Sequence, residues 1–151
     1  MNMTEKPLVL LVDDNEATCT LVTALLQRDF HVESALDGHE ALEKLRIKQY
    51  AAILLDLRMP QPDGYAILEF LHSTRPELLK NVLVLTASLT PKELARVHDY
   101  KVCGIIPKPF DIDSLLQAVK DCATPGTTPL NPGGLISSSV ILLLGELLRR
   151  M

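Results

Sequence analysis

The chain has 151 residues, a net charge of −4 at pH 7, and hydrophobic and charged fractions of 47% and 23%. This composition predicts an ordinary folded domain with a sizeable core. The acidic balance excludes a basic surface of the kind that binds nucleic acid, so we expect no direct nucleic-acid binding. The first residues carry no cleavage signal, and we expect a cytoplasmic protein.

Five short apolar runs recur at fairly even intervals and are predicted to be strands. They lie at residues 8–12, 31–35, 51–55, 81–87 and 102–106. The third run is followed at once by the carboxylate of Asp56. An apolar run of this kind is typical of a strand buried on both faces, and a charge at its end needs a compensating partner.

The segments between the runs have helical character. The first two helices are predicted within residues 15–29 and 38–50, with apolar faces formed by Ala17, Leu21, Ala24 and Leu25, and by Ala41, Leu42, Leu45 and Ile47.

A third helix is predicted over residues 63–73. A fourth begins at Thr90, with Pro91 in the first helical position and Glu93 completing a capping box. A fifth begins after Asp111 as its cap.

Alternating strands and helices indicate an α/β fold, a doubly wound five-stranded parallel sheet with helices on both faces. Such sheets bind ligands beyond the carboxyl ends of their strands. The polar residues at those ends are Asp13, Asp14, Asp56, Thr86 and Lys108. We therefore expect these side chains to meet at one edge of the sheet.

This set of residues has a chemical interpretation. Neighbouring carboxylates repel one another, and a divalent cation such as Mg²⁺ relieves that repulsion. The hydroxyl of Thr86 and the ammonium of Lys108 would contact the oxygens of a phosphoryl group. Asp56 would be the nucleophile that receives this group.

The chain resembles the receiver domain of response regulators in two-component signalling. The resemblance covers residues 7–122 and is carried by "VDDN", "DLRMPQPDG", "LTAS" and "PKPF". It implies a flavodoxin-like fold with strand order 2-1-3-4-5. It also implies a phosphoprotein switch that accepts a phosphoryl group on Asp56 from a histidine kinase or phosphotransfer protein in a phosphorelay. The phosphorylated domain would then signal through a conformational change to a downstream protein, which the sequence does not identify.

The resemblance further implies a role for each matching residue. Mg²⁺ would be bound directly by Asp14, through water by Asp13, and also by Asp56 and the main-chain carbonyl of Arg58. Thr86 and Lys108 would bind the phosphoryl oxygens.

Three further positions matter for the site. Ala87 would keep the approach to it uncrowded, and Gly64 would allow the turn after the acceptor strand. Ile105 departs from the family pattern, because receivers usually place an aromatic side chain three residues before the lysine. The usual conformational readout is therefore expected to differ here.

Two other functions are compatible with parts of this pattern. An aspartate-nucleophile, Mg²⁺-dependent phosphohydrolase also uses a hydroxyl and a lysine, but it needs an acid/base aspartate where this chain has Arg58. A docking module without phosphorylation is disfavoured because each acceptor-site residue is present. We expect no enzymatic activity apart from the domain's own phosphorylation and dephosphorylation.

The three cysteines are Cys19, Cys103 and Cys122. Their odd number and wide spacing predict neither a disulfide framework nor a zinc site. We expect them to be small core residues in a reducing compartment.

The sequence changes character after residue 122. Residues 123–134 are rich in proline and glycine and are predicted to be a linker, and residues 135–151 form an apolar tail. A spanning helix and a disordered segment are alternatives for this tail. We favour a helix that buries its leucines against the domain or against a second copy, which would permit self-association. This organisation predicts a stand-alone receiver with a short C-terminal tail.

Overall fold

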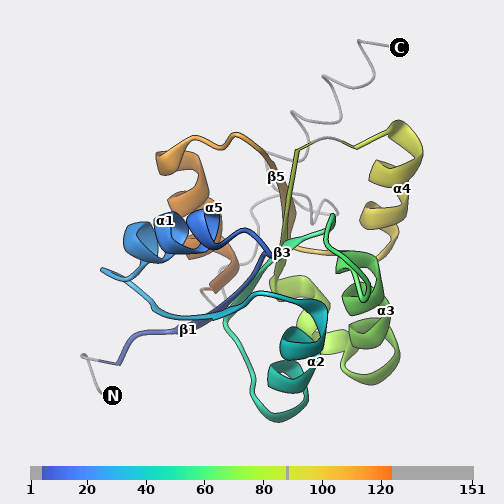
Figure 1. Cartoon of the computed structure of the whole chain (residues 1–151), viewed down its shortest axis with the longest axis horizontal. Helices are drawn as coiled ribbons and strands as arrows, with labels where there is room; N and C mark the ends of the chain where they lie inside the picture. The colour runs from blue at the N-terminus through green and yellow to red at the C-terminus, as the bar shows by residue number, and fades with distance from the viewer. Residues whose placement is uncertain (1–4, 88, 124–151) are drawn as a thin grey trace.

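The computed structural model describes residues 5–87 and 89–123 (Figure 1). The predicted linker and tail lie outside the described residues, apart from Ala123. Within the described part of the chain, no helix is long and apolar enough to cross a membrane.

Strands and helices alternate along the chain, as the sequence predicts (Figure 1). The strands are β1 (Leu8–Val12), β2 (His31–Ala35), β3 (Ala52–Asp56), β4 (Val82–Thr86) and β5 (Gly104–Pro107). The helices are α1 (Glu16–Leu26), α2 (Gly38–Ile47), α3 (Gly64–Thr74), α4 (Pro91–Asp99) and α5 (Ile112–Ala123), and a short 3₁₀ helix, η1 (Pro76–Asn81), precedes β4. The η1 helix has no counterpart among the elements predicted from the sequence.

The five strands form one parallel sheet in the order β2-β1-β3-β4-β5, which confirms the predicted topology. Every residue of β3 and β4 is buried. In the register, Asp56 lies beside Leu85, and Thr86 lies beside Pro107. The last residues of β3 and β4 are therefore neighbours at the carboxyl edge of the sheet.

Helices cover both faces of the sheet, α1 and α5 on one face and α2, α3 and α4 on the other (Figure 1). Each face has its own apolar core. Successive side chains of a strand point to opposite faces of the sheet, so each strand supplies both cores. Leu10 and Ile53 pack towards α2 and α3, whereas Val9 and Leu54 pack towards α1 and α5. This two-sided burial explains why the central strands are apolar throughout.

The apolar face predicted for the first helix is wrong, and the face predicted for the second helix is partly wrong. In α1 the buried residues are Cys19, Val22 and Leu26, whereas Leu21 is 51% exposed. In α2, Ile47 is 78% exposed. Both helices carry apolar residues on more than one side, so the periodicity alone does not determine which side meets the sheet.

Side-chain caps fix where the helices begin. Asn15, Asp63 and Asp111 each accept a hydrogen bond from the backbone amide three residues later, at 3.0 Å. Thr90 and Glu93 form the predicted capping box. These caps satisfy amides that a helix leaves without intrahelical partners, and they start α1, α3, α4 and α5 directly after the loops at the carboxyl edge.

The prediction for the cysteines is wrong for two of the three. Cys103 and Cys122 form a disulfide, with a Cα–Cα distance of 6.2 Å. A helix that follows a parallel strand runs back over the sheet, so the end of α5 returns to the start of β5, and their separation in sequence conceals this. Cys19 is free and buried as predicted, and burial with the nearby Asp13 charge raises the pKa of its thiol to about 11.

Candidate functional site

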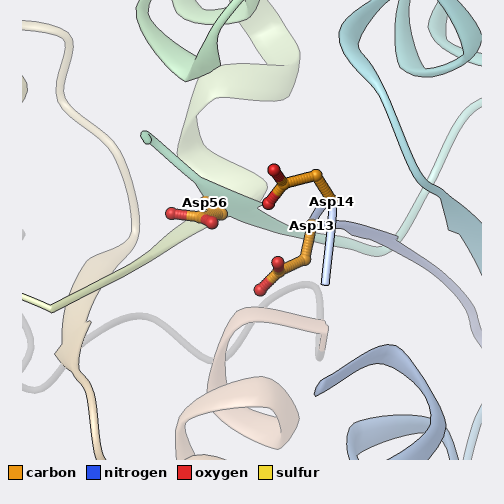
Figure 2. A group of neighbouring side chains, drawn as sticks. All are labelled: Asp13, Asp14 and Asp56. Atoms are coloured by element: carbon orange, nitrogen blue, oxygen red, sulfur yellow. The ribbon is translucent and has the colours of Figure 1, made fainter. Parts of the chain in front are cut away.

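The predicted site residues meet at the carboxyl edge of the sheet. Asp13 and Asp14 directly follow β1, and Asp56 and Thr86 are the last residues of β3 and β4. Lys108 directly follows β5. Figure 2 shows Asp13, Asp14 and Asp56 on adjacent strand ends, as the parallel topology requires.

The three carboxylates are close enough to share a cation. Each offers an oxygen, and these oxygens lie within 4.8 Å of one another. Asp13 is completely buried and Asp56 is 7% exposed, whereas Asp14 is exposed to solvent. Oxygen ligands in this arrangement fit a hard divalent cation such as Mg²⁺, whose charge offsets the repulsion between them.

Lys108 supplies positive charge to the same cluster. Its ammonium donates a hydrogen bond to Asp13 Oδ2 at 2.8 Å and lies 3.6 Å from Asp56 Oδ2. Burial opposes the charged form of Lys108, but the hydrogen bond to Asp13 and the charges of Asp13 and Asp56 outweigh it and raise the pKa of the ammonium. Lys108 therefore stays protonated and links the ends of β1, β3 and β5.

Asp56 lies in a less favourable environment for its charge. Its Oδ1 accepts a hydrogen bond from the backbone amide of Arg58 at 3.1 Å. Burial raises the pKa of Asp56 above the ordinary value, and the charges of Asp13 and Asp14 act in the same direction, while the Arg58 amide and Lys108 only partly compensate. A buried carboxylate that lacks full compensation gains stability from added positive charge.

Thr86 adds a second incompletely satisfied group. Its hydroxyl oxygen is buried, and it has no hydrogen-bond partner among the described residues. The neighbouring Ala87, which is predicted to keep the approach uncrowded, is exposed to solvent. A buried hydroxyl without a partner costs free energy, so this position is suited to a group that brings its own hydrogen-bonding oxygen.

Gly64 allows α3 to begin against the strand that carries Asp56. A Cβ atom at this position would lie 2.5 Å from Asp56 O and 2.5 Å from Leu57 Cα. Both contacts are with backbone, which cannot move aside as a flexible side chain can. Glycine is therefore required here for close approach of two backbone segments.

The side chain of Arg58 belongs to a network that the sequence analysis missed. Its guanidinium lies 3.4 Å from Glu93 Oε1, and the Tyr65 hydroxyl donates to Glu93 Oε2 at 3.1 Å. The guanidinium of Arg96 lies 4.1 Å from the centre of the Tyr65 ring. The network connects the loop after β3 with α3 and α4. In the sequence Glu93 indicates only a capping box, so no local pattern reveals this second role.

Ile105 occupies the position where an aromatic residue was expected from the resemblance. It is 1% exposed, lies beside Val84 of β4 and packs in the core shared with α2, α3 and α4. The side chain has no polar group that would bring it to the surface.

Two curated relatives match most of the described chain. Transcriptional regulatory protein ZraR of Salmonella typhimurium is 30% identical over 113 residues, which are 74% of this chain and 25% of that protein. Response regulator MprA of Mycobacterium ulcerans is 35% identical over 113 residues, 74% of this chain and 48% of that protein. The chain thus spans between a quarter and about half the length of these relatives.

Solved structures agree with this likeness. Chemotaxis response regulator CheY4 of Vibrio cholerae is 27% identical, with a TM-score of 0.71 over 78% of this chain and 98% of that chain. The receiver domain of Francisella response regulator 1452 is 25% identical, with a TM-score of 0.70 over 78% of this chain and 97% of that chain.

A family profile describes the same region. Residues 9–120 match the profile of the response regulator receiver domain. This range contains all of the site residues described above, from Asp13 at the end of β1 to Lys108 after β5. The chain belongs to the response regulator receiver domain family.

Proposed function

We propose that this protein is a phosphoacceptor switch in which Asp56 receives a phosphoryl group from a histidine kinase or phosphotransfer protein. The observation that carries the proposal is the buried cluster in which Lys108 contacts both Asp13 and Asp56. Family membership supports the same function. A response regulator is in general not an enzyme, and we extend the proposal to the domain's own phosphorylation and slow dephosphorylation.

In the proposed transfer, a carboxylate oxygen of Asp56 forms a bond to phosphorus while the bond from phosphorus to the donor imidazole nitrogen breaks. The imidazole keeps the electron pair of the broken bond. Lys108 and the Thr86 hydroxyl would then contact the phosphoryl oxygens, which gives the unpartnered hydroxyl an acceptor. Lys108 is already protonated and positioned, so little reorganisation is needed.

The proposed cofactor is Mg²⁺. Asp13, Asp14, Asp56 and the main-chain carbonyl of Arg58 would hold it, and the convergence of the three carboxylates supports this ligand set. When bound, Mg²⁺ supplies positive charge that offsets repulsion between the carboxylates and the incoming phosphoryl oxygens. Asp14, the exposed member of the cluster, is proposed as the direct ligand, and Asp13 as a ligand through water.

Labelling with acetyl phosphate in the presence of Mg²⁺ tests the assignment of Asp56. Asp56→Asn is expected to abolish the label, because the amide keeps the shape of the carboxylate but loses the nucleophilic oxygen. Exposed Asp99→Asn, at the end of α4, serves as the control and should label as the unmodified protein does. Label that persists at another residue in Asp56→Asn would contradict the assignment.

The same experiment distinguishes the alternatives. A switch gives a stable label of one phosphoryl group per chain, whereas a phosphohydrolase would consume many equivalents of donor. Arg58 is present where the hydrolase would need an acid/base aspartate, which favours the switch. A docking module would take up no label, neither in the unmodified protein nor in the Asp56→Asn protein.

The proposal extends to the location of the protein and to its partners. We propose a cytoplasmic location and a downstream protein partner, and membership of the receiver family supports both. Residues 135–151 are proposed to support self-association because of their apolar composition. Light scattering of the full chain, compared with a chain that ends at residue 123, should show loss of self-association in the shorter chain.

A further inference from the structure

The Cys103–Cys122 disulfide lies at the edge of the sheet opposite the phosphoacceptor site. Cys103 directly precedes β5, and Cys122 is in the last turn of α5. Lys108 follows the other end of β5. The disulfide therefore closes a ring formed by β5, the loop that carries Lys108, and α5.

The two disulfide cysteines are neither fully buried nor fully exposed. Both cysteines are partly exposed, and they pack on the margin of the core beneath α1 and α5. Cys19 differs, because it is 6% exposed and its Sγ donates to the backbone carbonyl of Asp13 at 3.3 Å. The partly exposed pair, Cys103 and Cys122, can therefore be compared with the buried thiol of Cys19 in the same chain.

Each cysteine lies on an element that is anchored by contacts other than the disulfide. The amide of Cys103 donates to Val82 O at the start of β4, at 2.8 Å. On the other element, Leu115 and Val119 of α5 are completely buried against the same face of the sheet. The Cα atoms, 6.2 Å apart, lie within the range that a disulfide spans, so these anchors keep two reduced cysteines in reach of each other.

We propose that Cys103 and Cys122 form a redox-sensitive staple that closes and opens by exchange with low-molecular-weight thiols and disulfides, and so clamps or releases the last turn of α5. This inference rests on the cytoplasmic location proposed above: cytosolic disulfides outside hyperthermophiles are usually transient or redox-sensing, which fits a partly exposed pair better than a permanent structural bond. The inference does not depend on phosphorylation of Asp56.

The exchange is balanced with oxidised glutathione as the oxidant. One protein thiolate attacks a glutathione sulfur, which forms a mixed disulfide and releases one glutathione thiolate. The second protein thiolate then attacks the protein sulfur of that mixed disulfide and releases the second glutathione thiolate. Two electrons pass from the protein to glutathione, and the two protons lost by the protein thiols are taken up by the released thiolates.

The experiment uses the full chain equilibrated in glutathione buffers from fully reduced to fully oxidised. Free thiols are alkylated under native conditions, and the protein is analysed by intact mass and peptide mapping. We expect Cys103 and Cys122 to be alkylated in the reduced buffer and linked to each other in the oxidised buffer, with Cys19 unmodified in both. Both cysteines still alkylated in the oxidised buffer, or each carrying glutathione, would overturn the proposal.

Amide hydrogen exchange tests the clamp itself. Formation of the disulfide should slow amide exchange in residues 119–123 by about tenfold or more. The cross-link restricts the locally unfolded state of the end of α5, from which these amides exchange. Cys103→Ser should abolish this difference between the two buffers, and Cys19→Ser should retain it. Equal exchange rates in the oxidised and reduced forms of the unmodified protein would show that no clamp exists.

Discussion

Two groups of buried or half-buried charges in this domain have opposite environments. At the phosphoacceptor site, burial and neighbouring carboxylates raise the pKa of Asp56. In the second group, the Glu33 cluster (Glu33, Lys48 and Tyr50), Glu33 accepts hydrogen bonds from Lys48 Nζ at 2.5 Å and from Tyr50 OH at 2.8 Å. The hydrogen bond from Lys48 is the main reason that the pKa of Glu33 is lowered.

The difference shows which group contributes to stability and which is kept for function. Glu33 on β2 has a donor for each oxygen, so its ionised form favours the folded state. Asp56 has one backbone donor and an ammonium at 3.6 Å, and nearby Thr86 has a hydroxyl without a partner. The site therefore stores unfavourable interactions that a metal ion and a phosphoryl group can relieve.

The largest expected effect on stability comes from Lys108→Ala. Without the ammonium, the buried charge of Asp13 loses its partner at 2.8 Å, so metal-free protein should lose about 2–4 kcal/mol of unfolding free energy. Urea unfolding in a chelating buffer measures this loss. Because Lys108 contacts the phosphoryl group and not the metal in our proposal, Mg²⁺ binding should persist.

Lys92→Ala is the control for that measurement. Lys92 is exposed on α4, and its removal should change the unfolding free energy by no more than about 0.5 kcal/mol. Equal stability of the Lys108→Ala and Lys92→Ala proteins would contradict the role given to the Lys108–Asp13 pair.

Gly64→Ala should have the next largest effect. At an unhindered helical position alanine is favoured over glycine, but here the added Cβ would lie 2.5 Å from the backbone of Asp56 and Leu57. We expect a loss of about 1–3 kcal/mol and weaker acyl-phosphate labelling, because Asp56 is displaced. Ser73→Ala, at an exposed position of the same helix, should be nearly neutral, and a stabilised Gly64→Ala protein would disprove the close approach.

The comparison of Glu33 with Asp56 predicts opposite dependences of stability on pH. The pKa of Glu33 is lowered from 4.5, so its contribution is present above the unfolded-state pKa and is lost as pH falls through the folded-state pKa. The pKa of Asp56 is raised from 3.8, so the folded state holds the proton longer and stability decreases as pH rises between the two pKa values.

Urea unfolding at a series of pH values in metal-free buffer separates these contributions. Glu33→Gln should cost about 1 kcal/mol at neutral pH, with the loss disappearing in acid, and should leave labelling unchanged. Asp56→Asn should remove the decrease in stability above pH 3.8. If both substitutions changed the pH profile in the same direction, the contrast between the two environments would be refuted.

The smallest expected effect concerns Ile105. Because its side chain is 1% exposed and wholly apolar, it should remain packed when Asp56 is phosphorylated. Amide chemical shifts should therefore change less in β5 than around Thr86 and in α4, whose Glu93 contacts Arg58 and also Tyr65 of α3. Changes that are largest at Ile105 would contradict this expectation and show that its side chain moves on phosphorylation.

The alternation of strands and helices, the caps at Thr90 and Asp111, and the edge at which the polar residues meet could all be predicted from the sequence. These features depend on local signals, such as the apolar run that ends at Asp56 and the Thr90–Glu93 capping box. The carboxyl ends of parallel strands share an edge, so local positions were enough to bring Asp13, Asp56 and Lys108 together.

Which apolar side of a helix is buried, and which distant groups become partners, depends on packing of the whole domain. Leu21 and Val22 are both apolar, and packing against the sheet buries Val22 alone. The Arg58–Glu93 ion pair and the Cys103–Cys122 disulfide join positions whose spacing in sequence carries no signal. Such contacts depend on how α4 and α5 return across the sheet, and that geometry is set by packing of the whole domain.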